Sequence, residues 1–167
     1  MSASALAREA GISKSTVSEL ERGNGNPSLD TLWALARTLN VSLGSLLADQ
    51  TNVGDSEFRR LVDAPVIARD GNEYVAQLMA GWHNTGEVEL AVVTLAPNAL
   101  RNSRGNTPGV VERVICVSGL VEVGPEGASR LLEPGDMLTF RADQPHRYHA
   151  RSEGGRLFVV QQYPTAS

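Results

Sequence analysis

Two sets of side chains in this sequence are suited to chemistry or to recognition. One is a carboxylate and an imidazole in the second half of the chain, Glu112 and His146. Such groups coordinate transition metals or anchor a polar small molecule. The other is a run of small polar side chains around one lysine, of the kind that reaches base edges and phosphates of DNA: Ser13, Lys14, Ser15 and Thr16. What each set can do depends on the elements that hold it.

Residues 2–48 have the pattern of short helices separated by turn residues. A glycine at position 11 ends the first predicted helix, and Ser13 is a candidate N-cap of the second. In that second helix Val17 and Leu20 are expected to face back into the domain. Two more helices follow. Two short helices joined by a tight turn are typical of a motif that reads DNA in the major groove.

Residues 6–47 resemble the phage-repressor-like (XRE) helix-turn-helix family. The features in family register are Leu6, Ala7, the turn at Gly11, the end at Glu21, Arg22 and Gly23, and the helix start at Pro27, Ser28 and Leu29. The resemblance implies that Lys14, Ser15, Thr16 and Glu19 read bases, with Ser18 beside them and Ser13 and Arg22 near phosphates. The family's first helix has no counterpart here, so we expect a start codon upstream of Met1.

Composition and charge limit the functional classes to which this protein can belong. The net charge is −4, and residues 1–48 carry four basic and four acidic side chains. Because phosphate neutralisation supplies most nonspecific DNA affinity, the helical half by itself is expected to bind DNA weakly. No apolar run approaches the ~18 residues of a membrane span, and no secretory signal is present. We therefore expect a soluble cytoplasmic protein with no membrane partner.

From about residue 59 the pattern of apolar residues changes to period two. The predicted strands are 73–82, 88–95, 110–117, 120–123, 136–140, 146–150 and 156–163. Many short strands separated by turn signals indicate a β-sandwich or barrel. The sequence therefore predicts an α + β protein of two domains. They are an all-α helix-turn-helix domain at 1–48 and an all-β domain at 59–167, joined by a linker at 49–58.

Residues 86–163 resemble the small cupin domains, which implies a double-stranded β-helix, or jelly-roll, barrel. The residues that match the two cupin motifs are Glu112, Gly119, Gly135, Asp136, Pro145 and His146. A metal cupin needs three histidines and one carboxylate. Here Asn106 and Thr107 stand where the first two histidines are expected, and only Glu112 and His146 remain. We predict no cofactor, with a divalent metal at this depleted site as the alternative.

Period-two geometry sorts the remaining polar side chains. Glu112 shares a face with Cys116, and His146 shares a face with Tyr148. A buried Glu112 needs a partner, and His146 is the natural one. The predicted effector pocket comprises Asn106, Glu112, Cys116, His146 and Tyr148. The alternative is a Glu–His pair left from a metal-binding ancestor that now only holds the barrel, with Cys116 as a buried apolar side chain.

These features together predict a one-component transcription regulator that is not an enzyme. Its predicted partners are a double-stranded DNA operator, a small-molecule effector and, as the resemblance implies, a second copy of the chain bound through the barrels. Two alternatives stay open. One is a metal-dependent cupin enzyme with a vestigial helical head, and the other is an antitoxin or adaptor that binds protein.

Overall fold

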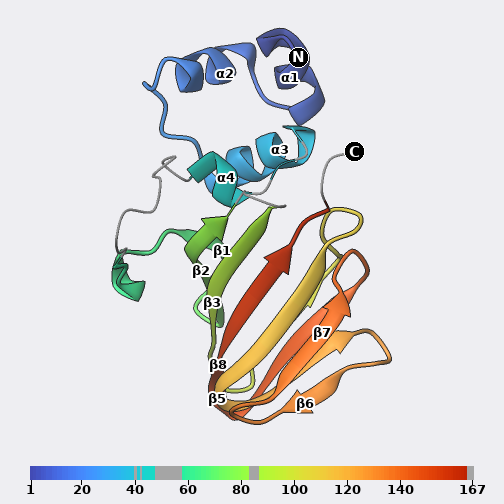
Figure 1. The fold of residues 1–167 in the computed structure, drawn as a ribbon. Coiled ribbons are helices and arrows are strands. Elements are labelled where there is room, and N and C mark those ends of the chain that lie inside the picture. The colour runs from blue at the N-terminus through green and yellow to red at the C-terminus, as the bar shows by residue number, and fades with distance from the viewer. Residues whose placement is uncertain (40, 42, 48–57, 83–86, 165–167) are drawn as a thin grey trace. The chain divides into compact units, whose positions relative to one another are not determined.

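The computed structural model describes residues 1–39, 41, 43–47, 58–82 and 87–164. The chain forms two compact units, Met1–Leu47 and Ala48–Ser167, the first helical and the second built of strands (Figure 1). Residues 49–57 of the predicted linker lie outside the described part. Among the described residues no helix is both long and apolar enough to cross a bilayer.

The first unit contains four helices: α1 (Ala3–Ala10), α2 (Lys14–Glu21), α3 (Leu29–Leu39) and α4 (Leu43–Leu47). The predicted cap of α2 is present, since Ser13 Oγ accepts a hydrogen bond from the Thr16 N–H at 3.0 Å. The chain leaves α1 at Gly11 in the left-handed conformation (φ 69°), which glycine adopts at little cost. This turn lets α2 double back on α1 after only three residues.

The core of this unit is made of small and medium apolar side chains. Ala7, Val17 and Leu35 are buried and bring together α1, α2 and α3. The partly buried side chains packed around them are Ala3, Leu6, Ala10, Ile12 and Leu20. Val17 and Leu20 thus face inward as predicted, which leaves the polar side of α2 toward solvent.

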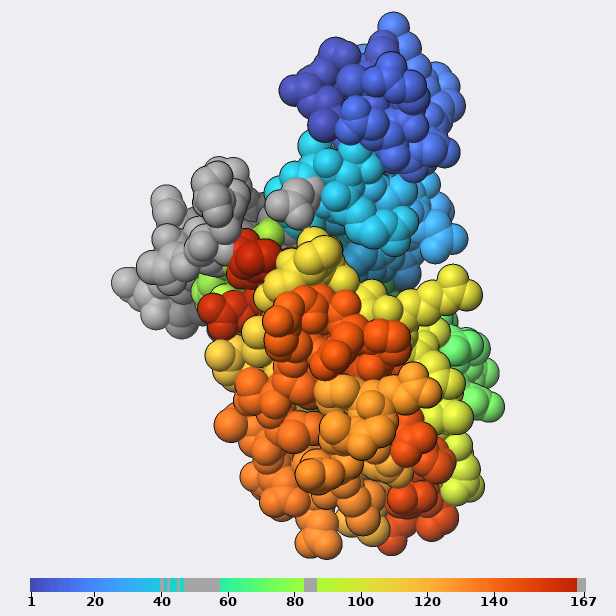
Figure 2. Space-filling view, turned by 90° about the vertical axis from the view of Figure 1, so that its right-hand side faces the viewer, coloured from blue at the N-terminus to red at the C-terminus, as the bar shows by residue number. Residues whose placement is uncertain are grey.

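The second unit begins with a single 3-10 turn (η1, Leu61–Asp63) and continues entirely in strands. These strands are β1 (Val66–Asp70), β2 (Tyr74–Trp82), β3 (Val88–Leu95), β4 (Leu100–Ser103), β5 (Val111–Pro125), β6 (Arg130–Leu132), β7 (Met137–Arg141) and β8 (His146–Gln162). All the recorded pairings are antiparallel. Figure 2 shows one face of this unit, formed largely by the β5–β7 region in yellow to orange.

The two longest strands, β5 and β8, lie side by side and pair along most of their length (Figure 1). The C-terminal half of β8 pairs with β3 and with the first half of β5, which also pairs with β7. The N-terminal half of β8 pairs with β4 and with the second half of β5, which also pairs with β6. The two halves of each long strand therefore have different partners, and together they join all eight strands into one connected antiparallel sheet.

The strand predictions differ from the structure at the two long strands. The predicted pairs of strands at 110–117 with 120–123, and at 146–150 with 156–163, are each one continuous strand. Gly119 explains the first case, because its left-handed φ of 78° bends β5 without ending it. It lies opposite Gly155 in the β5–β8 register. The short strands β1, β4 and β6 were not predicted.

Candidate functional site

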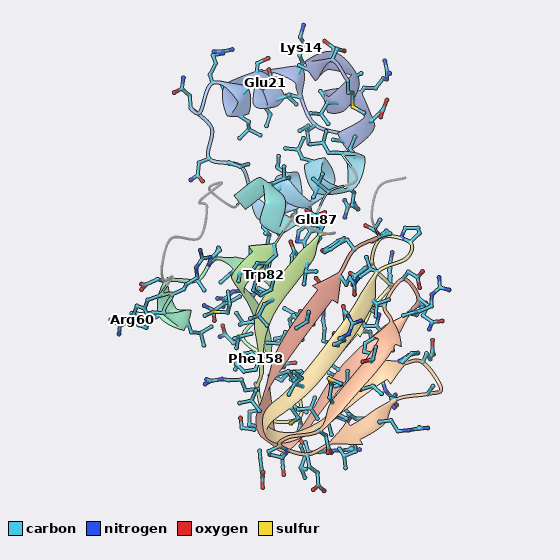
Figure 3. All side chains as sticks on the ribbon, in the orientation of Figure 1. Lys14, Glu21, Arg60, Trp82, Glu87 and Phe158 are labelled. Atoms are coloured by element: carbon cyan, nitrogen blue, oxygen red, sulfur yellow. The ribbon has the colours of Figure 1, made fainter. Side chains whose placement is uncertain are left out.

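The outer side of α2 carries the residues that the resemblance assigns to DNA. Thr16 and Ser18 are partly buried, and the exposed members of the set are Ser13, Lys14, Ser15, Glu19 and Arg22. Lys14 projects outward from the first turn of the helix (Figure 3). The structure thus places most of this set at the start and along one side of α2, with Arg22 at the C-cap.

Hydroxyl groups are linked at the start of α2. Ser13 Oγ lies 2.7 Å from Ser15 Oγ and 2.8 Å from Thr16 Oγ1, in addition to its cap bond. The positive end of the helix dipole and the Lys14 ammonium meet at the same place, and both favour a phosphate. The electrostatics at the first turn of α2 therefore favour an anion, with Ser15 exposed beside it.

Inside the barrel, Glu112 on β5 is 2 % exposed and forms the centre of a hydrogen-bonded cluster. Its Oε1 accepts from Asn106 Nδ2 at 2.9 Å and from Gln161 Nε2 at 2.7 Å, and its Oε2 accepts from the Tyr148 hydroxyl. A buried carboxylate is costly unless donors surround it. Three neutral donors meet that need here.

His146 lies next to this carboxylate without a direct hydrogen bond to it. Its Nδ1 donates to the Gln144 carbonyl at 2.8 Å, because a carbonyl oxygen can only accept. Its Nε2 lies 3.9 Å from Glu112 Oε1. The ring contacts those of Phe140 and Tyr148, with centroids 5.4 and 5.8 Å away. The imidazole is thereby held with Nε2 toward the carboxylate.

The three tyrosines lie near the same cluster, and nearby carboxylate charges raise their pKa values. Burial, followed by the negative charge of Glu112, raises the pKa of both Tyr74 and Tyr148. Burial raises the pKa of Tyr163 as well, and the carboxylate of Glu89, to which its hydroxyl donates at 2.9 Å, raises it further. The phenols therefore stay protonated as hydrogen-bond donors.

Four of the five residues predicted to form the pocket come together: Asn106, Glu112, His146 and Tyr148. Cys116 does not join them. Its thiol is directed to the carbonyl oxygens of Ser118 and Gly119, at 3.8 and 3.5 Å. Burial raises the pKa of this thiol, so little of it is the reactive thiolate near neutral pH. This contact pattern fits a packing residue.

Sequence reasoning missed Gln161 and Tyr74. Gln161 is the register partner of Glu112 across the β5–β8 pair. Tyr74 on β2 brings its ring to 6.1 Å from that of Tyr148, and the Arg101 guanidinium lies 5.6 Å from the Tyr74 ring centroid. Strand register alone would have located Gln161, but the sequence does not state which strands pair.

The described side chains do not fit the metal that cupin barrels of the three-histidine type hold. Among the described residues no group of three or more histidine, cysteine or acidic side chains converges. Asn106 and Gln161 both turn their amide nitrogens to Glu112, since a carboxylate only accepts. Two ligands, one of them already bonded to three donors, do not make a transition-metal site.

A helix-turn-helix unit joined to a jelly-roll barrel with a buried polar centre defines a two-domain protein of the cupin-regulator type. Residues 1–46 match the profile of the family described as Helix-turn-helix, and residues 91–161 match that described as Cupin domain. The chain is also 28% identical over 152 residues to the HTH-type transcriptional regulator SutR of Escherichia coli (strain K12). That alignment covers 91% of this chain and 80% of SutR.

Solved structures of related proteins have a similar fold. A crystal structure of an HTH_3 family transcriptional regulator from Vibrio cholerae has a TM-score of 0.64 at 23% identity, covering 98% of this chain and 88% of that one. The Cupin_2 domain of an XRE family transcriptional regulator from Enterobacter cloacae has a TM-score of 0.51 at 30% identity, covering 55% of this chain and 97% of that one. The chain belongs to the XRE-type helix-turn-helix regulators that carry a Cupin_2 domain.

Proposed function

We propose that this protein is a one-component transcription regulator that binds double-stranded DNA through α2 and responds to a small molecule bound in its barrel. The observation that supports the DNA-binding part of this proposal is that α2 has one apolar and one polar side. Val17 and Leu20 pack inward, whereas Lys14, Ser15 and Glu19 are exposed at its start and along its outer side. A recognition helix needs this division to enter the major groove.

The sensing half of the proposal rests on the centre of the barrel. Glu112, His146 and Tyr148 are buried polar groups held by neighbours, an arrangement that suits orientation of a polar ligand. A ligand acts on DNA binding only if it has different affinities for two arrangements of the protein. We propose that the barrel supplies this difference within a homodimer, which would read two half-sites about 34 Å apart.

The test is fluorescence anisotropy of the full chain on a duplex from the region upstream of its own gene, against a scrambled duplex of equal length. Because residues 1–48 have no net charge, selectivity must come from specific contacts. We expect tighter binding to the upstream duplex, a steep loss of affinity with salt, and two chains bound per duplex. Equal binding to both duplexes at low salt would refute the DNA-binding role.

A further inference from the structure

The outer surface of the barrel carries a row of apolar side chains across four neighbouring strands. Register pairing joins one residue from each of β3, β8, β5 and β7 into this row: Val92, Phe158, Ile115 and Met137. Side chains alternate between the two faces of a strand, and Leu157 is buried, so Phe158 and its register partners point outward. Phe158 is 39% exposed and Met137 is 59% exposed. The row therefore presents large apolar side chains to solvent.

The other half of the same two long strands has a polar outer surface. There the outward side chains of β8 are those of Arg147, His149 and Arg151, and β5 contributes Glu122. The Glu122 carboxylate binds both arginines, accepting from Arg147 Nη2 and, at 3.1 Å, from Arg151 Nη2. An antiparallel sheet with one face in water is expected to be polar on that face. The half with the apolar row departs from this pattern, as a contact surface does.

Arginines border the row in a regular arrangement. The outward side chains, in chain order, are Arg156, Phe158 and Val160 on β8 and Arg113, Ile115 and Val117 on β5. Together with Met137 they form the outer patch. Because the two strands are antiparallel, Val160 pairs with Arg113, and Arg156 pairs with Ser118, the residue after Val117. The two arginines therefore lie at diagonally opposite corners, each beside a valine.

This arrangement is complementary to itself. In a two-fold contact the same patch meets itself. With the two-fold axis along the strands, Arg113 lies over the partner's Val160, and with the axis across the strands it lies over the partner's Val117. Arg156 meets the other valine in each case. Neither orientation brings two arginines together, and an arginine stem packs on an apolar side chain while its guanidinium reaches solvent.

The charges around the outer patch add to zero. Outside the core, this half of β5 and β8, β7 and the turns beside β7 carry three basic and three acidic side chains: Arg113, Arg141, Arg156, Glu133, Asp136 and Asp143. A nucleic acid or an anionic membrane selects a basic surface, so neither is favoured here. An apolar centre with a polar border is the composition of a protein–protein contact. A second copy of the chain fits the patch in both shape of pattern and charge.

We propose that the outer patch is the surface through which two copies of this chain bind each other. The inference rests on the homodimer of the proposed function and deepens it, because it names the face that would hold the two chains together. Phe158 is the large aromatic side chain at the centre of this face, the kind of residue that contributes most to such a contact.

Sedimentation velocity of the full chain over a range of concentrations tests this proposal. We expect the wild type to sediment as a dimer. Phe158→Arg puts a charge at the centre of the contact, so the dimer dissociation constant should rise roughly thirtyfold or more. Met137→Arg, at the end of the row, should act in the same direction. Both positions are exposed, so the fold should survive, which far-ultraviolet circular dichroism checks.

Leu131→Arg is the matched control. Leu131 is 47% exposed on β6, outside the outer patch, so this variant should dimerise as the wild type does. A wild-type chain that stays monomeric at every concentration would overturn the proposal. So would a dimer that persists in both Phe158→Arg and Met137→Arg, or an equal loss of dimer in Leu131→Arg.

DNA anisotropy of the same variants separates this inference from the proposed function. We expect Phe158→Arg to bind the upstream duplex more weakly than the wild type, because two linked chains contact two half-sites together. A dimer that depends on the outer patch but binds DNA without selectivity refutes the DNA-binding role alone. Selective DNA binding by a dimer that Phe158→Arg and Met137→Arg leave intact refutes this inference alone.

Discussion

At the scale of single residues, the centre of the barrel is built around the cost of burying a charge. Glu112 is tolerated because three donors converge on it, Asn106 from the segment before β5 and Tyr148 and Gln161 from the two halves of β8. Removing one donor leaves the buried carboxylate with one hydrogen bond fewer, and removing Glu112 leaves all three donors without this partner, so these positions are coupled to one another. The same cost explains why His146 is held at a fixed orientation and not left to turn freely.

Ser15 offers a residue-scale prediction about DNA. If its exposed hydroxyl contacts a base edge, Ser15→Ala should relax the preference at one operator position by about 1 kcal/mol, with bulk DNA affinity nearly unchanged. The measurement is anisotropy on duplexes that differ at single positions. The Ser13 bond to the Thr16 N–H stays in place, so the helix start should survive the change.

Ser4→Ala, at an exposed position of α1, is the matched control for that experiment and should bind every duplex as the wild type does. A loss in Ser15→Ala that is equal on every duplex would instead assign the hydroxyl to a phosphate.

At the scale of elements, the length of β5 and β8 decides the architecture. Both strands continue past a glycine, so the two halves of each strand pair with different neighbours in one connected sheet. At Gly119 a Cβ would lie 2.1 Å from the Gly154 carbonyl oxygen, a distance that real contacts do not reach. Glycine is therefore required here for two reasons, the left-handed φ and the close approach of the opposite strand.

These two reasons can be separated by a pair of substitutions. Gly119 and Gly127 have the same φ of 78°, but at Gly127 a Cβ would meet nothing within 4 Å. Gly127→Ala should cost about 1–2 kcal/mol of unfolding free energy for the left-handed backbone alone. Gly119→Ala should cost about 1–3 kcal/mol more, because the added methyl group forces β5 and β8 apart.

Urea denaturation of the two variants measures this difference directly. Equal losses would show that the close approach between the strands adds nothing to the requirement for glycine at position 119.

At the scale of the whole molecule, ionisation of the tyrosines in the barrel is coupled to the free energy of unfolding. The chain's three tyrosines are Tyr74, Tyr148 and Tyr163, and burial together with nearby carboxylates raises the pKa of each. A raised pKa in the folded state contributes stability that is present below the unfolded pKa of about 10 and is lost as the pH rises above it. Alkaline unfolding is the expected consequence.

Ultraviolet absorbance and circular dichroism measured together as the pH rises test this coupling. We expect the tyrosinate band to stay absent near pH 10 while the fold is intact, and then to appear in one step for all three phenols as the barrel unfolds. In urea the same phenols should titrate near their ordinary value of about 10. A single tyrosine that ionises near pH 10 in the folded protein would show that its phenol is open to solvent.

Local signals in the sequence were sufficient for the helices and for part of the barrel. The cap at Ser13, the turn at Gly11 and the inward faces of Val17 and Leu20 each depend on neighbours within a few positions. Period-two spacing likewise placed His146 and Tyr148 on one face, and both are buried. The short strand β4 was missed because four residues carry too little periodicity.

What the sequence by itself determined is therefore the class of each half, the residues on the outer side of α2 and the loss of the cupin histidines, since all of these depend on residue type and short spacing. Only the tertiary structure decided that Gln161 completes the cluster at Glu112, that Cys116 stays outside it, and that His146 makes no direct hydrogen bond to Glu112. The physical reason is that strand register joins residues up to 49 positions apart, and no local propensity encodes that pairing.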